Sequence, residues 1–143
     1  MTTAQGQTAA ADQPAQRAGL ASFRLMSTGK KREWIDLFAE DCLFEDPVGA
    51  SPLDPAGRGH RKSELAAFWD KSIGLGKMTV KCRKAKPRGN ECAFLVDSTN
   101  EITGHPPLEV EAIVIYRVND AGKITSVRAF WEFDAAVAAT LPT

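Results

Sequence analysis

The spacing of apolar residues changes once along this chain, close to Gly76. Before that point, large apolar side chains recur every three to four positions, which is the periodicity of an amphipathic helix. After it, apolar and polar residues alternate, which is the periodicity of a strand with one buried face. Helices followed by consecutive strands predict an α+β fold, in which the helices pack on one face of a curved, mainly antiparallel sheet.

Three helices are predicted before the change of period. The first covers residues 15–27 and ends before Gly29, and the third covers residues 62–73. A short second helix is predicted from an apolar stripe between them, made of Trp34, Ile35, Leu37 and Phe38.

Extended segments lie on either side of the third helix. Residues 42–46 form a short apolar run that stops at Pro47, and the Pro- and Gly-rich residues 48–60 are expected to form a loop. Turn signals divide the alternating region into four strands. The first runs from Met78 to a turn at residues 87–90, and the others are expected at 92–102, 108–118 and 124–133.

The composition is that of an ordinary globular domain. With 143 residues the chain has the length of one domain, roughly 100–200 residues. Residues 1–14 are mostly Ala, Gln, Thr and Gly, which predicts a disordered tail and leaves residues 15–143 as a single domain. Lys and Arg number 18, as do Asp and Glu. The zero net charge argues against nucleic-acid or membrane binding and does not oppose self-association.

The three cysteines indicate a reducing compartment. They are odd in number and have no CxxC spacing, which argues against a disulfide framework and a zinc site. No segment has the length of apolar sequence that a membrane span needs, and the N-terminus lacks the pattern of a secretory signal. The sequence therefore predicts a cytosolic protein.

Asp46 is the most informative candidate for chemistry. In an extended run it shares a face with Cys42 and Phe44, whereas Leu43 and Glu45 face the other side. If Phe44 points into the core, the Asp46 carboxylate looks into the same apolar interior. Desolvation there would raise the pKa of the carboxyl and make it a useful proton-transfer base. The alternative is a cap on the turn at Pro47, since Asp-Pro commonly begins turns.

Three stretches resemble the ketosteroid isomerase branch of the nuclear transport factor 2-like (SnoaL-like) superfamily. They are LFAEDCLFEDPVGAS at 37–51, GRGHRKSELAAFWDKSIG at 57–74 and YRVNDAGKITSVRAFWE at 116–132. The resemblance implies a cone in which three helices close over a curved sheet around a deep apolar pocket. It also implies that Asp46 is a cofactor-free general base, which moves a proton between two carbons of a steroid enone.

The resemblance breaks at the groups that stabilise the oxyanion. Ketosteroid isomerases place a Tyr and a protonated Asp at the substrate oxygen. Alignment puts Ser22 in the position of that Tyr and Val114 in the position of that Asp. Tyr116 lies two residues after Val114, on the same strand face, and is the candidate replacement donor. The alternative is that Tyr116 is a core aromatic with its hydroxyl at the rim.

The expected pocket and dimer surface use opposite faces of the sheet. The ligand is expected to be a hydrophobic small molecule such as a steroid. Ile113 and Ile115 would expose apolar surface on the outer face, where relatives in this branch form homodimers. The predicted pocket residues are Ser22, Phe23, Met26, Phe44, Phe68, Trp69, Val114, Tyr116 and Trp131.

The remaining polar residues are weaker candidates. Glu109 and Glu111, like Glu45, fall on strand faces that point away from the pocket. His60 and His105 are expected to be solvated loop residues, and their spacing predicts no metal site. The basic run at residues 77–88 alternates with apolar side chains and lacks interleaved aromatics, which is typical of an exposed strand and not of a nucleic-acid surface.

Three functional hypotheses follow. The favoured one is an isomerase-like enzyme that uses Asp46 on a hydrophobic carbonyl compound, a steroid or a polyketide. The second is a non-catalytic binding module for the same kind of ligand, because both usual oxyanion donors are replaced. The third is a vestigial pocket, with the outer sheet face serving only as a dimer or protein-partner surface.

Overall fold

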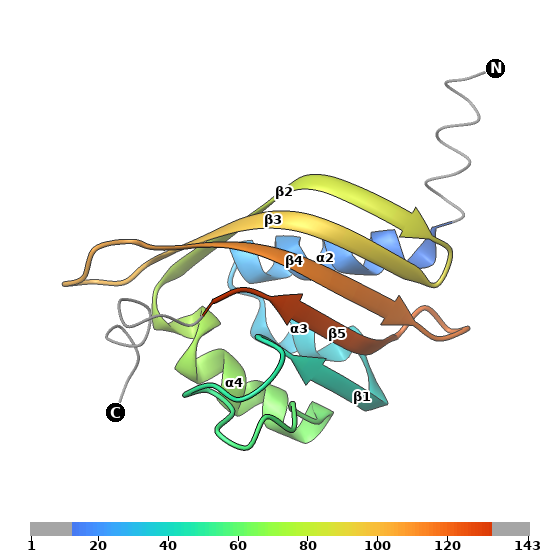
Figure 1. The fold of residues 1–143 in the computed structure, drawn as a ribbon, viewed down its shortest axis with the longest axis horizontal. Helices are drawn as coiled ribbons and strands as arrows, with labels where there is room; N and C mark the ends of the chain where they lie inside the picture. The colour runs from blue at the N-terminus through green and yellow to red at the C-terminus, as the bar shows by residue number, and fades with distance from the viewer. Residues whose placement is uncertain (1–12, 133–143) are drawn as a thin grey trace.

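A five-stranded mixed sheet organises residues 13–132, which are the residues that the computed structural model describes. The strand order is β1-β5-β4-β3-β2, with β1 parallel to β5 and the other neighbours antiparallel (Figure 1). The strands are β1 (Phe38–Glu45), β2 (Lys77–Arg88), β3 (Glu91–Glu101), β4 (Leu108–Val118) and β5 (Ile124–Phe130).

The helices cover one face of this sheet. Within residues 13–132 there are three α-helices: α2 (Pro14–Ser27), α3 (Lys31–Asp36) and α4 (Leu65–Lys71). Short 3-10 turns flank α4, η1 (Lys62–Glu64) before it and η2 (Ile73–Leu75) after it. Helix α2 packs across β2, β3 and β4. Helix α4 contacts α3 and lies beneath the strands in the view of Figure 1. The predicted α+β architecture with three leading helices is confirmed.

The ends of two sequence predictions lie outside the described residues. The predicted tail is described only at residues 13 and 14, and Pro14 already begins α2. The last strand was expected to reach Phe133, which lies outside the described range, and β5 ends at Phe130.

Phe38 belongs to a strand, so its predicted place in the second helix is wrong. Helix α3 ends at Asp36, and the carbonyl of Leu37 accepts a hydrogen bond from the backbone N–H of Ile124 at 2.9 Å. Phe38 then pairs with Ile124 in the parallel β1–β5 ladder. The partner strand, which comes late in the sequence, therefore extends β1 back to residues whose local pattern is helical.

Aromatic side chains fill the space between the helices and the sheet. Trp34 of α3 is fully buried and packs edge-to-face on Phe38 and Phe44, with ring centroids 4.9 and 5.5 Å apart. On the other side of the core, Phe23 of α2 contacts Phe94 at 5.0 Å and Tyr116 at 5.6 Å. These contacts fix the depth at which α2 and α3 sit above the sheet.

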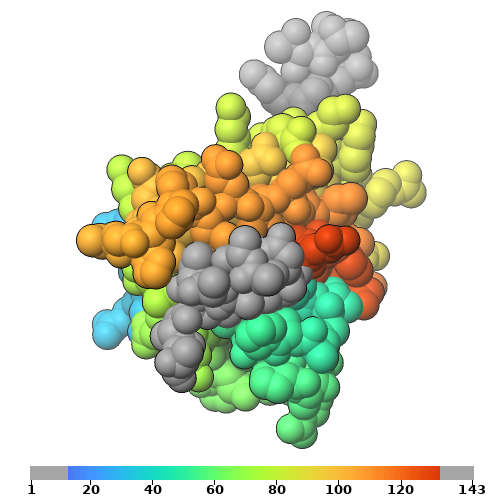
Figure 2. Space-filling model, turned by 60° about the vertical axis from the view of Figure 1, so that its left-hand side comes forward, coloured from blue at the N-terminus to red at the C-terminus, as the bar shows by residue number. Residues whose placement is uncertain are grey.

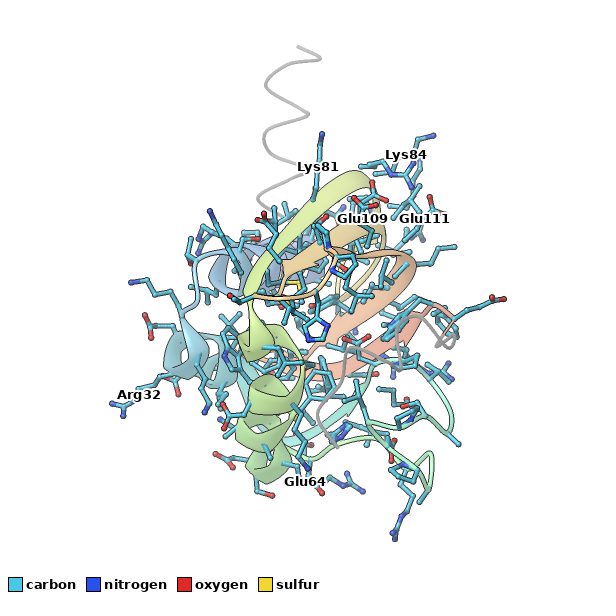
Figure 3. All side chains as sticks on the ribbon, turned by 90° about the vertical axis from the view of Figure 1, so that its left-hand side faces the viewer. Arg32, Glu64, Lys81, Lys84, Glu109 and Glu111 are labelled. Atoms are coloured by element: carbon cyan, nitrogen blue, oxygen red, sulfur yellow. The ribbon has the colours of Figure 1, made fainter. Side chains whose placement is uncertain are left out.

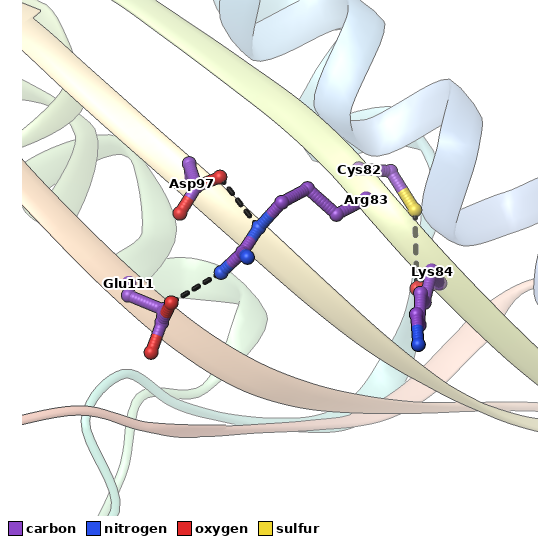
Figure 4. A network of polar contacts seen from close by, with 5 residues as sticks. All are labelled: Cys82, Arg83, Lys84, Asp97 and Glu111. Atoms are coloured by element: carbon purple, nitrogen blue, oxygen red, sulfur yellow. Dashed lines mark hydrogen bonds and ion pairs between the residues drawn. The ribbon is translucent and has the colours of Figure 1, made fainter.

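Charged residues occupy much of the outer side of the sheet. Figure 3 shows Lys81, Lys84, Glu109 and Glu111 projecting from it, away from α4. Arg83 bridges β3 and β4, with its Nε 2.7 Å from Asp97 Oδ2 and a second ion pair to Glu111 (Figure 4). The basic run of β2 is thus an exposed strand, as its alternation predicts.

In Figure 2, β3 and β4 form a continuous surface above the loop that follows β1.

Among residues 13–132, no helix combines the length and apolarity needed to cross a membrane.

Gly19 is expected to be essential to the close packing of α2 on the sheet. A Cβ at this buried position would overlap the Phe94 ring, although Gly-to-Ala changes in helices usually stabilise. Gly19→Ala should therefore lower the free energy of unfolding by about 1–3 kcal/mol, the usual range for overpacking. Urea denaturation measures this change. Arg24→Ala, at an exposed position of the same helix, is the control, and a stabilised Gly19→Ala would contradict the close packing.

Candidate functional site

A mainly apolar cavity lies between the concave face of the sheet and helices α2 and α4. Apolar side chains from the helices and the sheet make up most of its wall. Phe23 and Met26 contribute from α2, Phe68 from α4, and Val114 and Tyr116 from β4. An apolar molecule is the kind of ligand that such a wall accommodates.

Asp46 lies at the point where β1 enters the cavity wall. Cys42 and Phe44 are buried on one face of β1, and Asp46 follows on the same side, half-buried and lining the cavity. Its Oδ1 accepts a hydrogen bond from the indole Nε1–H of Trp131 at 2.5 Å. Among residues 13–132, Oδ2 has no hydrogen-bond partner. Among the described residues, the carboxylate is thus oriented through one oxygen, and the other oxygen is left without a partner.

The surroundings of Asp46 favour its neutral form. Burial raises the pKa of the carboxyl above its ordinary value. The Trp131 hydrogen bond and the nearby His60 ring lower the pKa and only partly oppose this effect. A carboxyl with a raised pKa is a stronger base than an exposed one, which suits it to accept a proton from carbon.

Tyr116 is the second polar group of the cavity wall. Only 2% of its surface is exposed, and its hydroxyl lies 2.8 Å from the hydroxyl of Ser22. Burial raises the pKa of the Tyr116 phenol, the Ser22 hydrogen bond lowers it, and the Asp46 charge raises it further. Tyr116 therefore stays protonated at physiological pH, so its hydroxyl keeps a proton that it is able to donate.

Most of the residues predicted to form the pocket do line the cavity. The structure places seven of them on its wall: Phe23, Met26, Phe44, Phe68, Val114, Tyr116 and Trp131. Asp46, the predicted base, lies on the same wall.

Ser22 and Trp69 do not line the cavity, so the prediction places them wrongly. Ser22 is fully buried behind the wall, and Trp69 packs against Trp34 with ring centroids 5.4 Å apart. Each is next in sequence to a residue that does line the cavity, Phe23 and Phe68 respectively. One residue turns a helix by about 100°, which is enough to move a side chain off the cavity-facing side.

His60 is not the solvated loop residue that its sequence context predicts. Its backbone pairs with that of Phe44 through hydrogen bonds of 2.8 and 2.9 Å. The ring packs 5.0 Å from that of Phe68, and Nε2 lies 3.2 Å from the carbonyl oxygen of Leu53. Pairing with β1 draws this loop inward, so His60 supports the cavity wall from behind. His105, by contrast, is exposed.

The sequence analysis missed several lining residues. On β4, strict alternation from Val114 would have found Leu108, Val110 and Ala112, which share its face. The same rule applied to β3 would have found Val96, Ser98 and Asn100. Leu53, which lies in a loop, and Leu75 of η2 carry no local signal that distinguishes them from other apolar loop residues.

Comparison with known sequences identifies the family. Residues 20–127 match the SnoaL-like domain. The chain belongs to the SnoaL-like family. This family is part of the nuclear transport factor 2-like superfamily, whose fold the described residues share.

Solved structures similar to this SnoaL-like protein include steroid-related ones. Rv0760c of Mycobacterium tuberculosis, in complex with estradiol-17β-hemisuccinate, is 34% identical with a TM-score of 0.81, covering 85% of this chain and 96% of its own. A Δ5-3-ketosteroid isomerase from Mycobacterium sp. is 34% identical with a TM-score of 0.81, covering 86% and 96%. A computationally designed 17-OHP binder is 33% identical with a TM-score of 0.80, covering 85% and 94%.

Asp46 is expected to make the folded protein less stable as the pH rises. Because its pKa is raised in the folded state, that state keeps a proton which the unfolded chain releases at lower pH. The free energy of unfolding therefore falls between the ordinary pKa and the raised one. Asp46→Asn should melt a few degrees above the wild type at pH 7, and the difference should vanish below the ordinary carboxyl pKa.

Thermal melts from pH 3 to pH 8 measure this effect. Asp120→Asn, in an exposed turn, is the matched control and should show no such pH-dependent gain. A difference between Asp46→Asn and the wild type that does not change with pH would contradict the desolvation of this carboxyl.

Proposed function

We propose that this SnoaL-like protein is a cofactor-free isomerase of a hydrophobic carbonyl compound, a steroid or a polyketide, with Asp46 as its general base. The observation that carries the proposal is a half-buried carboxylate in an apolar cavity, held at one oxygen by Trp131 and unbonded at the other within residues 13–132. Tyr116 lines the same cavity as a protonated phenol. A base and a hydrogen-bond donor are the two groups that an enolisation needs.

The reaction moves one proton and leaves the composition of the substrate unchanged. Asp46 Oδ2 takes a proton from the carbon between a carbonyl and a double bond. The electron pair of that C–H bond moves into the carbonyl, which becomes a dienolate, and Tyr116 donates a hydrogen bond to the negative oxygen. The protonated Asp46 then returns the proton to the far carbon of the former double bond, which gives the conjugated enone and restores the carboxylate.

Each polar residue has a separate task in this scheme. The indole of Trp131 fixes the direction of the Asp46 carboxylate, which limits the conformations from which the proton is taken. The apolar wall raises the pKa of Asp46 and strengthens the hydrogen bond to the oxyanion. The similarity to a Δ5-3-ketosteroid isomerase and to a protein in complex with an estradiol derivative supports a steroid-like ligand.

A second candidate function is binding without turnover. Val114 stands where the resemblance expects a second oxyanion donor, and its side chain cannot donate a hydrogen bond. The likeness to a designed 17-OHP binder supports this alternative. The two candidates share the ligand class and differ only in whether Tyr116 alone lowers the barrier enough for measurable turnover.

Substitutions at the proposed base and donor are expected to have different effects on a 5-en-3-one steroid. Asp46→Asn should abolish isomerisation and leave ligand affinity within a few fold, because the side chain keeps its shape. Tyr116→Phe should lower kcat by roughly 10²–10³, the usual loss for one oxyanion donor. Absorbance of the conjugated enone product follows the reaction, and titration with a steroid measures binding.

Glu45→Gln is the matched control, because Glu45 pairs with Arg128 on the other face of β1 and should not affect turnover. Tight binding by a wild-type protein that shows no turnover would favour the binding module. Unchanged turnover in Asp46→Asn would refute Asp46 as the base.

We also propose that the outer sheet face joins two copies of this chain. Ile113 is 53% exposed and pairs across strands with Phe130, which is 41% exposed, and Leu95 lies opposite Ile113 on β3. Ion pairs border this apolar patch, Arg83 with Asp97 and Glu111 on one side and Arg117 with Glu91 on the other. A two-fold axis through the patch would bury the apolar centre and leave charges of both signs at its rim.

Removing the apolar centre is expected to separate the two copies. Ile113→Lys should convert a dimer into a monomer, because it places a charge at the middle of the interface. Light scattering at tens of micromolar measures the mass. Leu20→Lys, which changes an exposed apolar residue on α2, should leave the dimer intact. A monomeric wild-type protein at that concentration would rule out the dimer.

A further inference from the structure

Three polar side chains form a chain of hydrogen bonds behind the cavity wall. The indole Nε1 of Trp34 lies 2.9 Å from Ser22 Oγ, and Ser22 Oγ lies 2.8 Å from Tyr116 Oη. Trp34 and Ser22 are fully buried, and Tyr116 is 2% exposed. The three residues come from α3, α2 and β4, so the fold itself brings these groups together.

Hydrogen-bond chemistry sets the direction at the first link. An indole N–H can only donate, so Ser22 Oγ accepts the hydrogen bond from Trp34. Ser22 still has its own hydroxyl proton, and the described residues offer it two acceptors. One is Tyr116 Oη at 2.8 Å, and the other is the thioether sulfur of Met26 at 3.8 Å.

The second link has a preferred direction for the same reason. Thioether sulfur is a weak acceptor, so the Ser22 proton is better placed on the Tyr116 oxygen. Tyr116 Oη then keeps its proton for another partner, and no residue among 13–132 other than Ser22 bonds it. Because Tyr116 lines the cavity, an oxygen of a ligand bound there is in a position to accept this proton. In the reverse direction the phenol would present only lone pairs to the ligand.

We propose that Trp34 and Ser22 are positioning residues, which direct the hydroxyl proton of Tyr116 at the carbonyl oxygen of the ligand. This inference rests on the proposed function, because it requires a ligand with a carbonyl or phenol oxygen in the cavity. Successive hydrogen bonds that run in one direction polarise each other, so Tyr116 becomes a better donor than an isolated phenol. Ser22 acts only through Tyr116 and touches no ligand.

The ionisation of a bound phenol tests the relay without any turnover. Estradiol is a suitable probe, because the absorbance of its phenol changes when the proton leaves. A donor at the phenol oxygen stabilises the phenolate, so it increases the ionisation constant of the bound probe. The titrations use the Asp46→Asn background, which removes the competing negative charge from the cavity.

Four variants in this background separate the relay from a purely structural effect. Tyr116→Phe should lower the ionisation constant of the bound phenol roughly ten- to a hundredfold, and Ser22→Ala roughly three- to tenfold. Ser22→Ala combined with Tyr116→Phe should equal Tyr116→Phe alone, because Ser22 acts only through the phenol. Ser126→Ala, which removes a half-buried hydroxyl from β5 outside the cavity wall, should leave the constant unchanged.

The results distinguish the relay from the proposed function. If Ser22→Ala binds the probe and ionises it as the Asp46→Asn parent does, the relay is refuted. It is also refuted if Ser22→Ala adds a further loss to Tyr116→Phe. Failure of the parent to bind estradiol refutes the relay together with a steroid-like ligand. A relay that holds in a protein without isomerase activity leaves the relay standing and refutes only the enzymatic function.

If Ser22→Ala fails to fold, Trp34→Phe takes its place in the same comparison. This variant removes the indole N–H, which is the first donor of the hydrogen-bond chain. Trp34→Phe should lower the ionisation constant of the bound phenol, as Ser22→Ala does, and should have no effect in the Tyr116→Phe background. A loss that persists in that background would overturn the relay.

Discussion

The parallel pairing of β1 with β5 is the interaction on which the candidate site depends. Phe44 lies opposite Val127 and Glu45 opposite Arg128, so Asp46 leaves β1 beside Ala129. The backbone of Val48 then bonds the carbonyl of Ala129 at 2.9 Å, which continues the contact past Asp46. This register brings the Asp46 carboxylate to the indole of Trp131, 85 residues away in sequence. Without this pairing, Asp46 would lie at a free strand end.

The cavity holds polar groups whose burial lowers the stability of the fold unless each group has a hydrogen-bond partner. Its apolar wall desolvates Asp46, and each buried polar group needs a partner. Trp131 supplies that partner for Asp46, and Ser22 supplies it for Tyr116. The second oxygen of Asp46 has no partner within residues 13–132, and it is the one that the proposed reaction uses. Two of the polar groups at the cavity wall, the Asp46 carboxylate and the Tyr116 hydroxyl, are thus each oriented by a side chain of the described residues.

The two faces of α2 make different contacts at the site. Phe23 and Met26 meet the cavity, whereas Ser22 faces Trp34 of α3 and the hydroxyl of Tyr116. The resemblance placed Ser22 where ketosteroid isomerases carry a donor on the helix. In this chain the Tyr116 phenol projects from β4, and Ser22 of α2 lies 2.8 Å from its hydroxyl. The cavity wall thus carries a phenol that comes from the sheet and not from the helix.

The sequence by itself determined the class of fold and the side on which Asp46 faces. Both follow from periodicity, because apolar spacing reports which side of a helix or strand meets the core. The same rule assigned Phe44, Val114 and Tyr116 to the cavity wall. Only the tertiary structure decided that Phe38 is a strand residue, that His60 is drawn inward, and that Ser22 and Trp69 lie behind the wall. These outcomes depend on β5, β1 and α3 as neighbours, and the local pattern of a segment carries no information about which neighbour it meets.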